Sequence, residues 1–345
     1  NKNFITRLRG TSNYVQHTSL TNATIKIVLD DANNYDYGRY YDNQCSIVSK
    51  TPKYTGDVIV PEYAYDSHGS EYTVTVIYKK AFLDCSDMTS ITFLGNSVTE
   101  ISEYAFKNTG LTTITIPYCV TYIGPRTFLG CTRLTTVTLP AGVTYIGQGA
   151  FQGCTILTTI TLPNSLTSIE PSTFLGCTSL TTIAIPYRVK SIEANAFQGC
   201  TDLSTITMSN SVTTIGASAF QRCTSLTTIT MPNSVTTIGA SAFQYCSGLT
   251  TITIPNSVTT IGASAFQDCS GLTTITIPDG VTGIGARAFQ GCTSLTTIAI
   301  PAGVTSIEAS TFQGCTSLTT IKFPAGVTTI GENAFQGCTI LKTII

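Results

Sequence analysis

The chain has 345 residues, with 18 Lys and Arg against 19 Asp and Glu, a formal net charge of -1 and 42% hydrophobic residues. This composition excludes a disordered chain, and the near-zero charge gives no general electrostatic basis for nucleic-acid binding. No apolar run approaches the roughly 20 residues that a membrane helix needs, so we expect no membrane insertion.

The N-terminal part differs in composition from the rest. Residues 1–81 hold 17 of the 37 charged side chains, ten of the 16 Tyr and both His, His17 and His68. Because a composition shift marks a boundary, we predict a capping region at residues 1–55 and a degenerate, interrupted first repeat at residues 56–81. The start NKNF has neither an initiator Met nor an apolar signal segment, which indicates a mature or trimmed chain.

An oxygen-rich segment lies within the predicted cap. Residues 30–42, DDANNYDYGRYYD, concentrate Asp, Asn and Tyr. Calcium takes about 6–8 oxygen ligands, but the spacing of these residues matches no EF-hand. A solvated loop is therefore the preferred interpretation, with calcium binding and a Tyr-rich adhesive surface as the alternatives.

From residue 82 onward the sequence repeats. Twelve Phe recur from Phe82 to Phe335, and from Phe128 every interval is 23 residues. A fixed period of about 20–50 residues is typical of a solenoid, in which each unit covers the apolar edge of the next. We predict a solenoid of 12 units over residues 82–345.

The clean unit at residues 249–270, LTTITIPNSVTTIGASAFQDCS, indicates the geometry. Leu249, Ile252 and Ile254 fit the strand pattern of a leucine-rich repeat, with the Thr residues between them facing outward. Pro255 ends this strand, because it has no N–H to donate.

The second half of the unit contains shorter elements. Residues 258–261 alternate apolar and polar, which predicts a second short strand that Gly262 ends. Residues 263–266 are predicted to form one helical or 3₁₀ turn, with Ala265 and Phe266 packed inward. The predicted fold class is an α/β repeat: a right-handed leucine-rich repeat solenoid of 23-residue units, each with short strands and a short helical turn.

The repeated pattern I-P-x-x-V-x-x-I-G-x-x-A-F-x-x-C-x-x-L, as at residues 254–272, resembles the BspA-like, or Treponema-type, leucine-rich repeat family. The resemblance covers residues 82–345 and extends more weakly upstream. Ser257 stands where the commoner leucine-rich consensus has Asn or Cys, so the animal and plant subfamilies are poor guides to the loops. The resemblance implies a secreted or cell-surface protein, often linked to adhesion to host or neighbouring-cell proteins.

Eleven of the 13 Cys form a column, Cys85 and then Cys131 to Cys338 in steps of 23. Metal sites favour closely spaced Cys pairs, which this sequence lacks. In-register stacking would point the Cβ vectors in parallel, which suits a disulfide badly, so we predict a ladder of buried, unlinked thiols. Some disulfides, or a reactive thiol, are the alternatives. Cys45 and Cys119 lie off the column, and we expect Cys45 to be the more exposed.

Catalytic patterns are weak. A Ser-His-Asp or Cys-His arrangement would need His17 or His68, both outside the regular repeats, and no pair of carboxylates suggests acid–base chemistry. Residues 283–288 match G-x-G-x-x-A, but Gly285 is the repeat glycine and no long helix is predicted after it. We therefore predict no enzyme activity and no cofactor or metal.

The remaining candidates are exposed residues that depart from the repeat consensus toward types common at binding hot spots. Tyr122 and Tyr145 share one column, so their rings should stack about 5 Å apart on the outside. We predict binding of an extracellular protein ligand by Tyr118, Tyr122, Arg126, Arg133, Tyr145, Tyr187, Arg188 and Lys190. Neutral variation of exposed positions is the competing interpretation.

Two further functional alternatives stay open. The chain could be a passive surface scaffold or spacer, or its Thr-x-Thr rows could bind ice or a crystal surface, although Ala184, Ala299 and Lys322 interrupt those rows. Because the repeats stop at Ile345 in a strand position without a polar cap, we expect either further residues or self-association at that edge.

Overall fold

The computed structural model describes residues 14–17, 25–29, 44–49, 53–65 and 71–344. Two compact units make up the chain, residues 1–165 and residues 166–345, here called unit 1 and unit 2. The boundaries predicted after residues 55 and 81 stay predictions.

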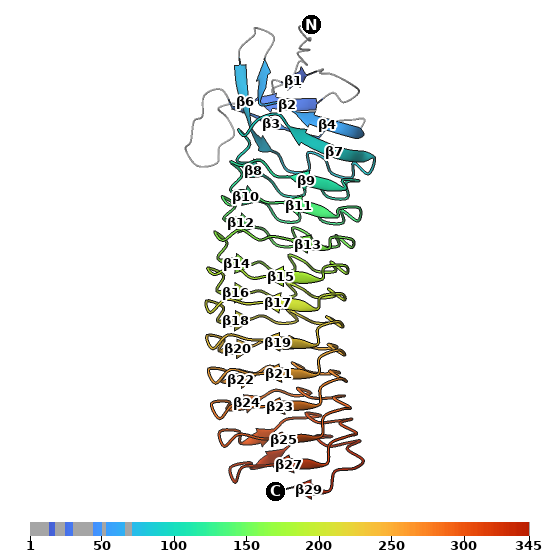
Figure 1. Ribbon diagram of the computed structural model, residues 1–345, viewed down its shortest axis with the longest axis vertical. Helices are drawn as coiled ribbons and strands as arrows, with labels where there is room; N and C mark the ends of the chain where they lie inside the picture. The colour runs from blue at the N-terminus through green and yellow to red at the C-terminus, as the bar shows by residue number, and fades with distance from the viewer. Residues whose placement is uncertain (1–13, 18–24, 30–43, 50–52, 66–70, 345) are drawn as a thin grey trace. The chain divides into compact units, whose positions relative to one another are not determined.

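Unit 1 contains an N-terminal sheet that continues into short parallel strands (Figure 1). The strands of this sheet are β1 (Tyr14–His17), β2 (Ile25–Leu29), β3 (Gln44–Ile47), β5 (Tyr63–Tyr65), β6 (Glu71–Ile77), β8 (Glu100–Ile101), β10 (Tyr122–Ile123) and β12 (Tyr145–Ile146). β1 and β2 pair antiparallel, β3 pairs antiparallel with β2 and parallel with β6, and β5 lies antiparallel to β6. The other strands of unit 1 are β4 (Gly56–Val60), β7 (Met88–Phe93), β9 (Thr113–Thr115), β11 (Thr136–Thr138) and β13 (Thr159–Ile160).

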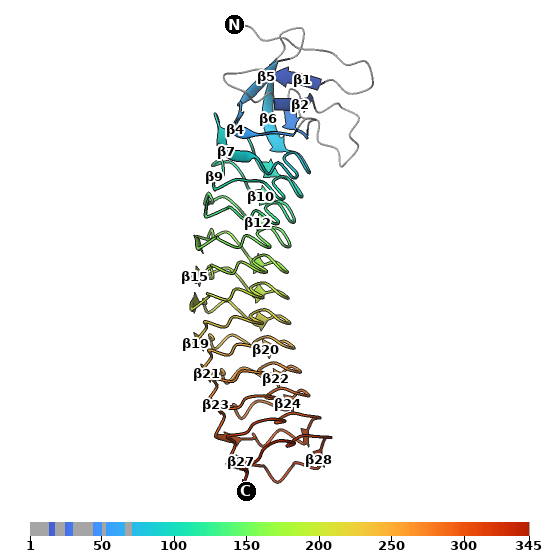
Figure 2. The same cartoon turned by 90° about the vertical axis from the view of Figure 1, so that its right-hand side faces the viewer.

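Unit 2 carries two series of short parallel strands, one from each half of the repeat (Figures 1 and 2). The first series is β15 (Thr182–Ala184), β17 (Thr205–Thr207), β19 (Thr228–Thr230), β21 (Thr251–Thr253), β23 (Thr274–Thr276), β25 (Thr297–Ala299), β27 (Thr320–Lys322) and β29 (Thr343–Ile344). The second is β14 (Ser168–Ile169), β16 (Ser191–Ile192), β18 (Thr214–Ile215), β20 (Thr237–Ile238), β22 (Thr260–Ile261), β24 (Gly283–Ile284), β26 (Ser306–Ile307) and β28 (Thr329–Ile330).

Strand register follows the sequence period. Thr251 pairs with Thr274 and Ile261 with Ile284, each 23 residues later. In β21 the two Thr side chains are exposed while Ile252 between them is buried, as the alternation predicts. Leu249 and Ile254 are buried as well, so the assigned strand register is confirmed.

The segment between the second strand and the next coil is a run of turns, and no helix occurs in the part of the chain that the structure describes. Alternate N–H groups close the turns. The N–H of Ala265 donates to the Gly262 carbonyl at 3.2 Å, and the N–H of Cys269 donates to the Phe266 carbonyl at 3.2 Å. The N–H groups between them reach the next coil, as when Phe266 donates to the Ala288 carbonyl at 2.8 Å. Every second residue thus bonds to the neighbouring coil, a pattern that a continuous helix could not provide.

Left-handed backbone conformations make this pattern possible. Ser264 has φ of 56° and Asp268 has φ of 57°, and both conformations break a right-handed helix. The predicted short helical turn is therefore replaced by consecutive tight turns. Ala265 and Phe266 nevertheless pack inward as expected, because the turns keep them on the core side.

The core of unit 2 contains a stack of Phe rings. Phe220 lies between Phe197 and Phe243, with ring centroids 5.5 and 5.4 Å apart and interplanar angles of 1° and 10°. The stack repeats from coil to coil because each Phe occupies the same position of the 23-residue unit. This confirms that no coil buries its apolar residues alone.

Candidate protein-binding surface

The turn that follows β15 carries the predicted site residues of unit 2. Pro186 ends the strand, and the N–H of Val189 donates to the Pro186 carbonyl at 3.1 Å, which closes a β-turn. Tyr187 and Arg188 are the two corner residues, so their side chains point outward. Val189 is buried, and Lys190 after it is exposed again.

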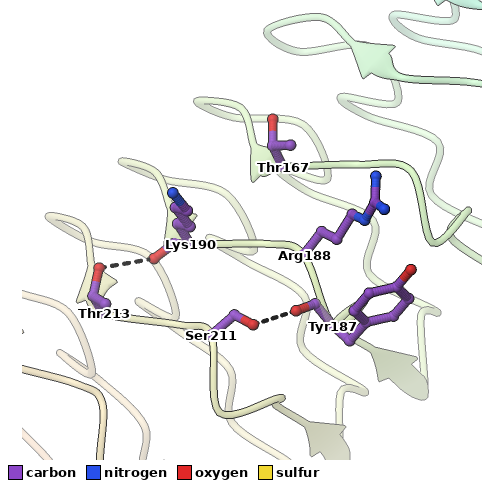
Figure 3. Close-up of a pocket in the computed structure, with 6 residues that line it drawn as sticks. All are labelled: Thr167, Tyr187, Arg188, Lys190, Ser211 and Thr213. Atoms are coloured by element: carbon purple, nitrogen blue, oxygen red, sulfur yellow. Dashed lines mark hydrogen bonds between the residues drawn. The ribbon is translucent and has the colours of Figure 1, made fainter.

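This turn borders an open groove, here called the Tyr187 groove, of about 610 Å³ (Figure 3). The residues that line it come from three successive coils, and the Arg188 and Lys190 side chains project to the same side. The lining residues are Thr167, Tyr187, Arg188, Lys190, Ser211 and Thr213.

Backbone and hydroxyl hydrogen bonds hold the groove in shape. The N–H of Lys190 donates to the Thr167 carbonyl at 2.9 Å, and the Lys190 carbonyl accepts from the N–H of Thr213 at 2.8 Å. The Thr213 hydroxyl donates to the same carbonyl at 3.2 Å, and the Ser211 hydroxyl donates to the Tyr187 carbonyl. Both hydroxyl hydrogens are thus used within the protein, and the hydroxyl oxygens remain as acceptors.

The charge of the groove is positive. Arg188 lies 5.7 Å from the centroid of the Tyr187 ring, which fits a cation–π contact. No salt bridge to Arg188 or Lys190 occurs among the described residues, and no carboxylate lines the groove. Tyr187 itself is 56% exposed. The three residues combine an accessible ring with two cations that form no salt bridge among the described residues.

The predicted residues of unit 1 form a second group. Tyr122 and Tyr145 stack at 5.1 Å between centroids with an interplanar angle of 13°, as predicted. The pair is less exposed than expected, because Tyr122 is only 36% exposed and Tyr145 is half-buried. Burial raises the pKa of the Tyr122 hydroxyl, and Tyr145, Glu100 and Glu103 raise it further, so the ring stays neutral.

The other predicted residues of unit 1 differ in their surroundings and exposure. Arg126 lies 3.9 Å from Glu103 and 5.7 Å from the Tyr104 ring centroid, so its charge is already partnered. Tyr118 is 74% exposed. Arg133 is exposed as well, and it makes no salt bridge within the described residues.

The sequence prediction missed the groove hydroxyls of Thr167, Ser211 and Thr213. The period alone could have found them, because Thr167 and Thr213 stand 23 residues before and after Lys190, and Ser211 stands 23 after Arg188. A further pair, Arg222 over the Tyr245 ring at 5.1 Å, also lay outside the predicted set.

The Cys column is a ladder of hydrogen-bonded thiols. The Sγ of Cys246 donates to the Phe220 carbonyl at 3.1 Å and that of Cys269 to the Phe243 carbonyl at 3.1 Å, each one coil back. Burial raises the pKa of Cys246 to about 12. The prediction of buried, unlinked thiols is confirmed for Cys131 and for Cys200 to Cys315, whereas Cys338 is half-buried. Cys119 is exposed, and the Cys45 side chain lies outside the described residues.

Thiol labelling tests the ladder. In native, reduced protein we expect Cys119 to react first with a bulky disulfide reagent, because it is exposed. Cys200 to Cys315 should react only after denaturation, since a buried neutral thiol is a poor nucleophile. Peptide mapping by mass spectrometry locates the label. Labelling or oxidation of most column cysteines in native protein would contradict the ladder.

The other sequence candidates concern metal binding, catalysis and nucleotide binding, and several of them lie outside the described residues. No group of at least three His, Cys, Asp or Glu suited to a metal ion is found among the described residues. The oxygen-rich segment at residues 30–42 and His68 lie outside the described residues, and so does the side chain of His17. The G-x-G-x-x-A match falls on β24 and a turn, so it is a repeat feature as predicted.

The sequence matches the profile of the BspA type leucine rich repeat region over residues 69–170, 144–273 and 236–345. No curated protein sequence matches the chain. Within the part that the structure describes, no helix has the length and apolarity needed to cross a membrane.

Solved structures with the same architecture include proteins from three bacteria. A leucine-rich repeat protein from Bacteroides ovatus is 29% identical, with 89% of this chain and 91% of that one covered and a TM-score of 0.60. A leucine rich cell surface protein from Faecalibacterium prausnitzii is 27% identical, with 95% of this chain and 94% of that one covered and a TM-score of 0.53. A leucine-rich repeat protein from Eubacterium ventriosum shares the fold. It is 23% identical, with 93% of this chain and 94% of that one covered and a TM-score of 0.54. These structures confirm the predicted leucine-rich repeat solenoid.

Proposed function

This chain belongs to the BspA-type leucine-rich repeat family, and from that premise we propose that it is a non-catalytic, extracellular or cell-surface solenoid that binds proteins of a host or of neighbouring cells. The observation that carries the proposal is the similarity, along nearly the whole chain, to a bacterial cell surface protein. In a solenoid of this kind the repeated core serves stability, so specificity resides in exposed residues that differ between coils.

Two surface groups support protein binding. In unit 1, Tyr122 and Tyr145 offer a stacked aromatic surface. In unit 2, the Tyr187 groove combines a ring with two cations. Tyr and Arg are among the residue types most enriched at binding hot spots: Tyr offers a large contact area on two χ angles, and Arg offers five N–H donors on a planar group.

A direct binding measurement tests the proposal. The full chain, immobilised on a biosensor, should bind at least one member of a panel of extracellular-matrix and mucosal proteins in a saturable way. The double change Tyr122→Ser and Tyr145→Ser should weaken that binding about tenfold, since it removes the aromatic surface. Ser already occupies this column at Ser168 and Ser191, so the variant is expected to fold.

Two outcomes would contradict the proposal or its site. Absence of saturable binding across the panel would favour a passive scaffold or spacer. If the double variant binds normally, but replacement of residues 30–42 by a short Gly/Ser linker abolishes binding, the binding surface lies in the N-terminal region and not in the repeats. A thermal melt of each variant serves as the folding control.

A further inference from the structure

Positive charge is scarce in unit 2, and two of its cations line one groove. Six Lys and Arg residues occur in this unit, Arg188, Lys190, Arg222, Arg287, Lys322 and Lys342. Arg188 and Lys190, the first two, line the same groove, one buried residue apart. Since neither has a salt bridge within the described residues, the groove holds uncompensated charge that a ligand can neutralise.

We propose that the Tyr187 groove binds an extended, carboxylate-bearing segment of a protein partner. This inference rests on the proposed protein-binding function and adds the chemistry of the partner. The guanidinium of Arg188 can donate two parallel N–H bonds to one carboxylate, and the ammonium of Lys190 adds a second cation on the same side.

The neighbouring coils indicate one localised negative charge and not a polyanion. In the Lys190 column the coils on either side carry Thr167 and Thr213, and Ser211 follows Arg188 in its column. A sulfated polysaccharide or a nucleic acid would require cations on successive coils, because its charge repeats along its length. The groove instead places a single cationic patch between uncharged hydroxyls.

The hydroxyls match the backbone of a peptide. Ser211 and Thr213 have donated their hydrogens to the Tyr187 and Lys190 carbonyls, so their oxygens are left to accept. An extended peptide supplies N–H donors for those oxygens beside its carboxylate. The Tyr187 ring offers an apolar surface to the rest of the segment at low entropy cost.

A reversion to the repeat consensus provides the test variant. Changing Tyr187→Asn, Arg188→Ser and Lys190→Thr recreates the Asn-Ser-Val-Thr sequence that stands one coil later, at residues 210–213. The reverted coil is therefore expected to fold like its neighbours. Arg222→Gly is the matched control, because it removes an exposed cation of unit 2 outside the groove, in a column where other coils carry Gly.

The experiment selects peptides from a random linear phage library on the wild-type chain, after depletion on the reverted chain. Enriched peptides should contain Asp or Glu at a recurrent position. In fluorescence polarisation, a synthetic enriched peptide should lose affinity about tenfold or more on the reverted chain or on Asp/Glu→Asn/Gln exchange in the peptide. Arg222→Gly should leave the affinity unchanged, and added salt should weaken binding.

Several results would overturn the inference: enrichment of peptides without acidic residues, no enrichment, or an equal loss with Arg222→Gly. Binding of a heparin oligosaccharide that is lost on reversion, without acidic-peptide binding, would assign the groove to a polyanion. Failure of the groove is distinguishable from failure of protein binding as such. The peptide assay tests the groove alone, so its failure while a panel protein still binds contradicts only the groove, whereas a panel without any binder of the wild-type chain contradicts the broader function.

Discussion

Replacing Phe220 with alanine is expected to lower the free energy of unfolding by about 3–5 kcal/mol. Phe220 is completely buried, and its ring stacks between those of Phe197 and Phe243. Removing it opens a cavity that two neighbouring coils border. Those coils are held in register by backbone hydrogen bonds, so they can close little of the space. Urea unfolding followed by circular dichroism measures the loss.

The matched control is Thr228→Ala, an exposed change in β19. Surface changes of this kind usually stay within about 0.5 kcal/mol. If Phe220→Ala lowers the free energy of unfolding by well under about 1 kcal/mol, the stacked Phe rings contribute little to the stability of the solenoid. An equal loss for both variants would instead point to a general sensitivity of the solenoid to substitution.

Raising the pH above 9 is expected to destabilise the protein steeply. Burial raises the pKa of Cys131 to about 11 and those of Cys246 and Cys315 to about 12, from an ordinary value of 9.0. Between pH 9 and the raised values, unfolded thiols lose protons that folded thiols keep. The unfolded state then binds fewer protons, so stability falls as pH rises, by roughly 1 kcal/mol per pH unit for each such thiol.

Urea titrations at successive pH values from 7 to about 11, under reducing conditions, measure this slope. Below pH 9 both states hold their thiol protons, so we expect no contribution from the ladder there. Cys246→Ala should make the alkaline slope shallower by one thiol, because that group no longer titrates. Changing the exposed Cys119 to Ser should leave the slope unchanged. A slope that is independent of Cys246 would rule out the buried ladder as its cause.

The periodicity of the sequence predicted most of the fold from particular residues. The 23-residue interval of Phe and Cys implied in-register coils, and the structure pairs Thr251 with Thr274 accordingly. The alternation around Ile252 predicted which side chains are buried. The same reasoning placed Tyr122 beside Tyr145, since residues one period apart must be neighbours in a stack.

The periodicity could not predict the conformation of the turn segment or how deeply individual side chains are buried. The pattern around Ala265 and Phe266 fits a helical turn as well as tight turns, because both bury the same two residues. The choice depends on N–H groups that bond to the next coil, as Ser264 does to Ala286 at 2.9 Å. Similarly, the position of Tyr122 in the repeat predicts which residues lie next to it, but it does not predict how much of the Tyr122 ring those residues cover.

For the candidate site, the sequence by itself determined which residues depart from the repeat and, through the period, which coils are adjacent. Tyr187, Arg188 and Lys190 were identified on that basis. Only the tertiary structure decided that the two cations lack salt bridges within the described residues, that Arg126 has one with Glu103, and that neighbouring hydroxyls complete a groove. The physical reason is that a one-dimensional period specifies neighbours, whereas charge pairing and exposure depend on where each side chain points in three dimensions.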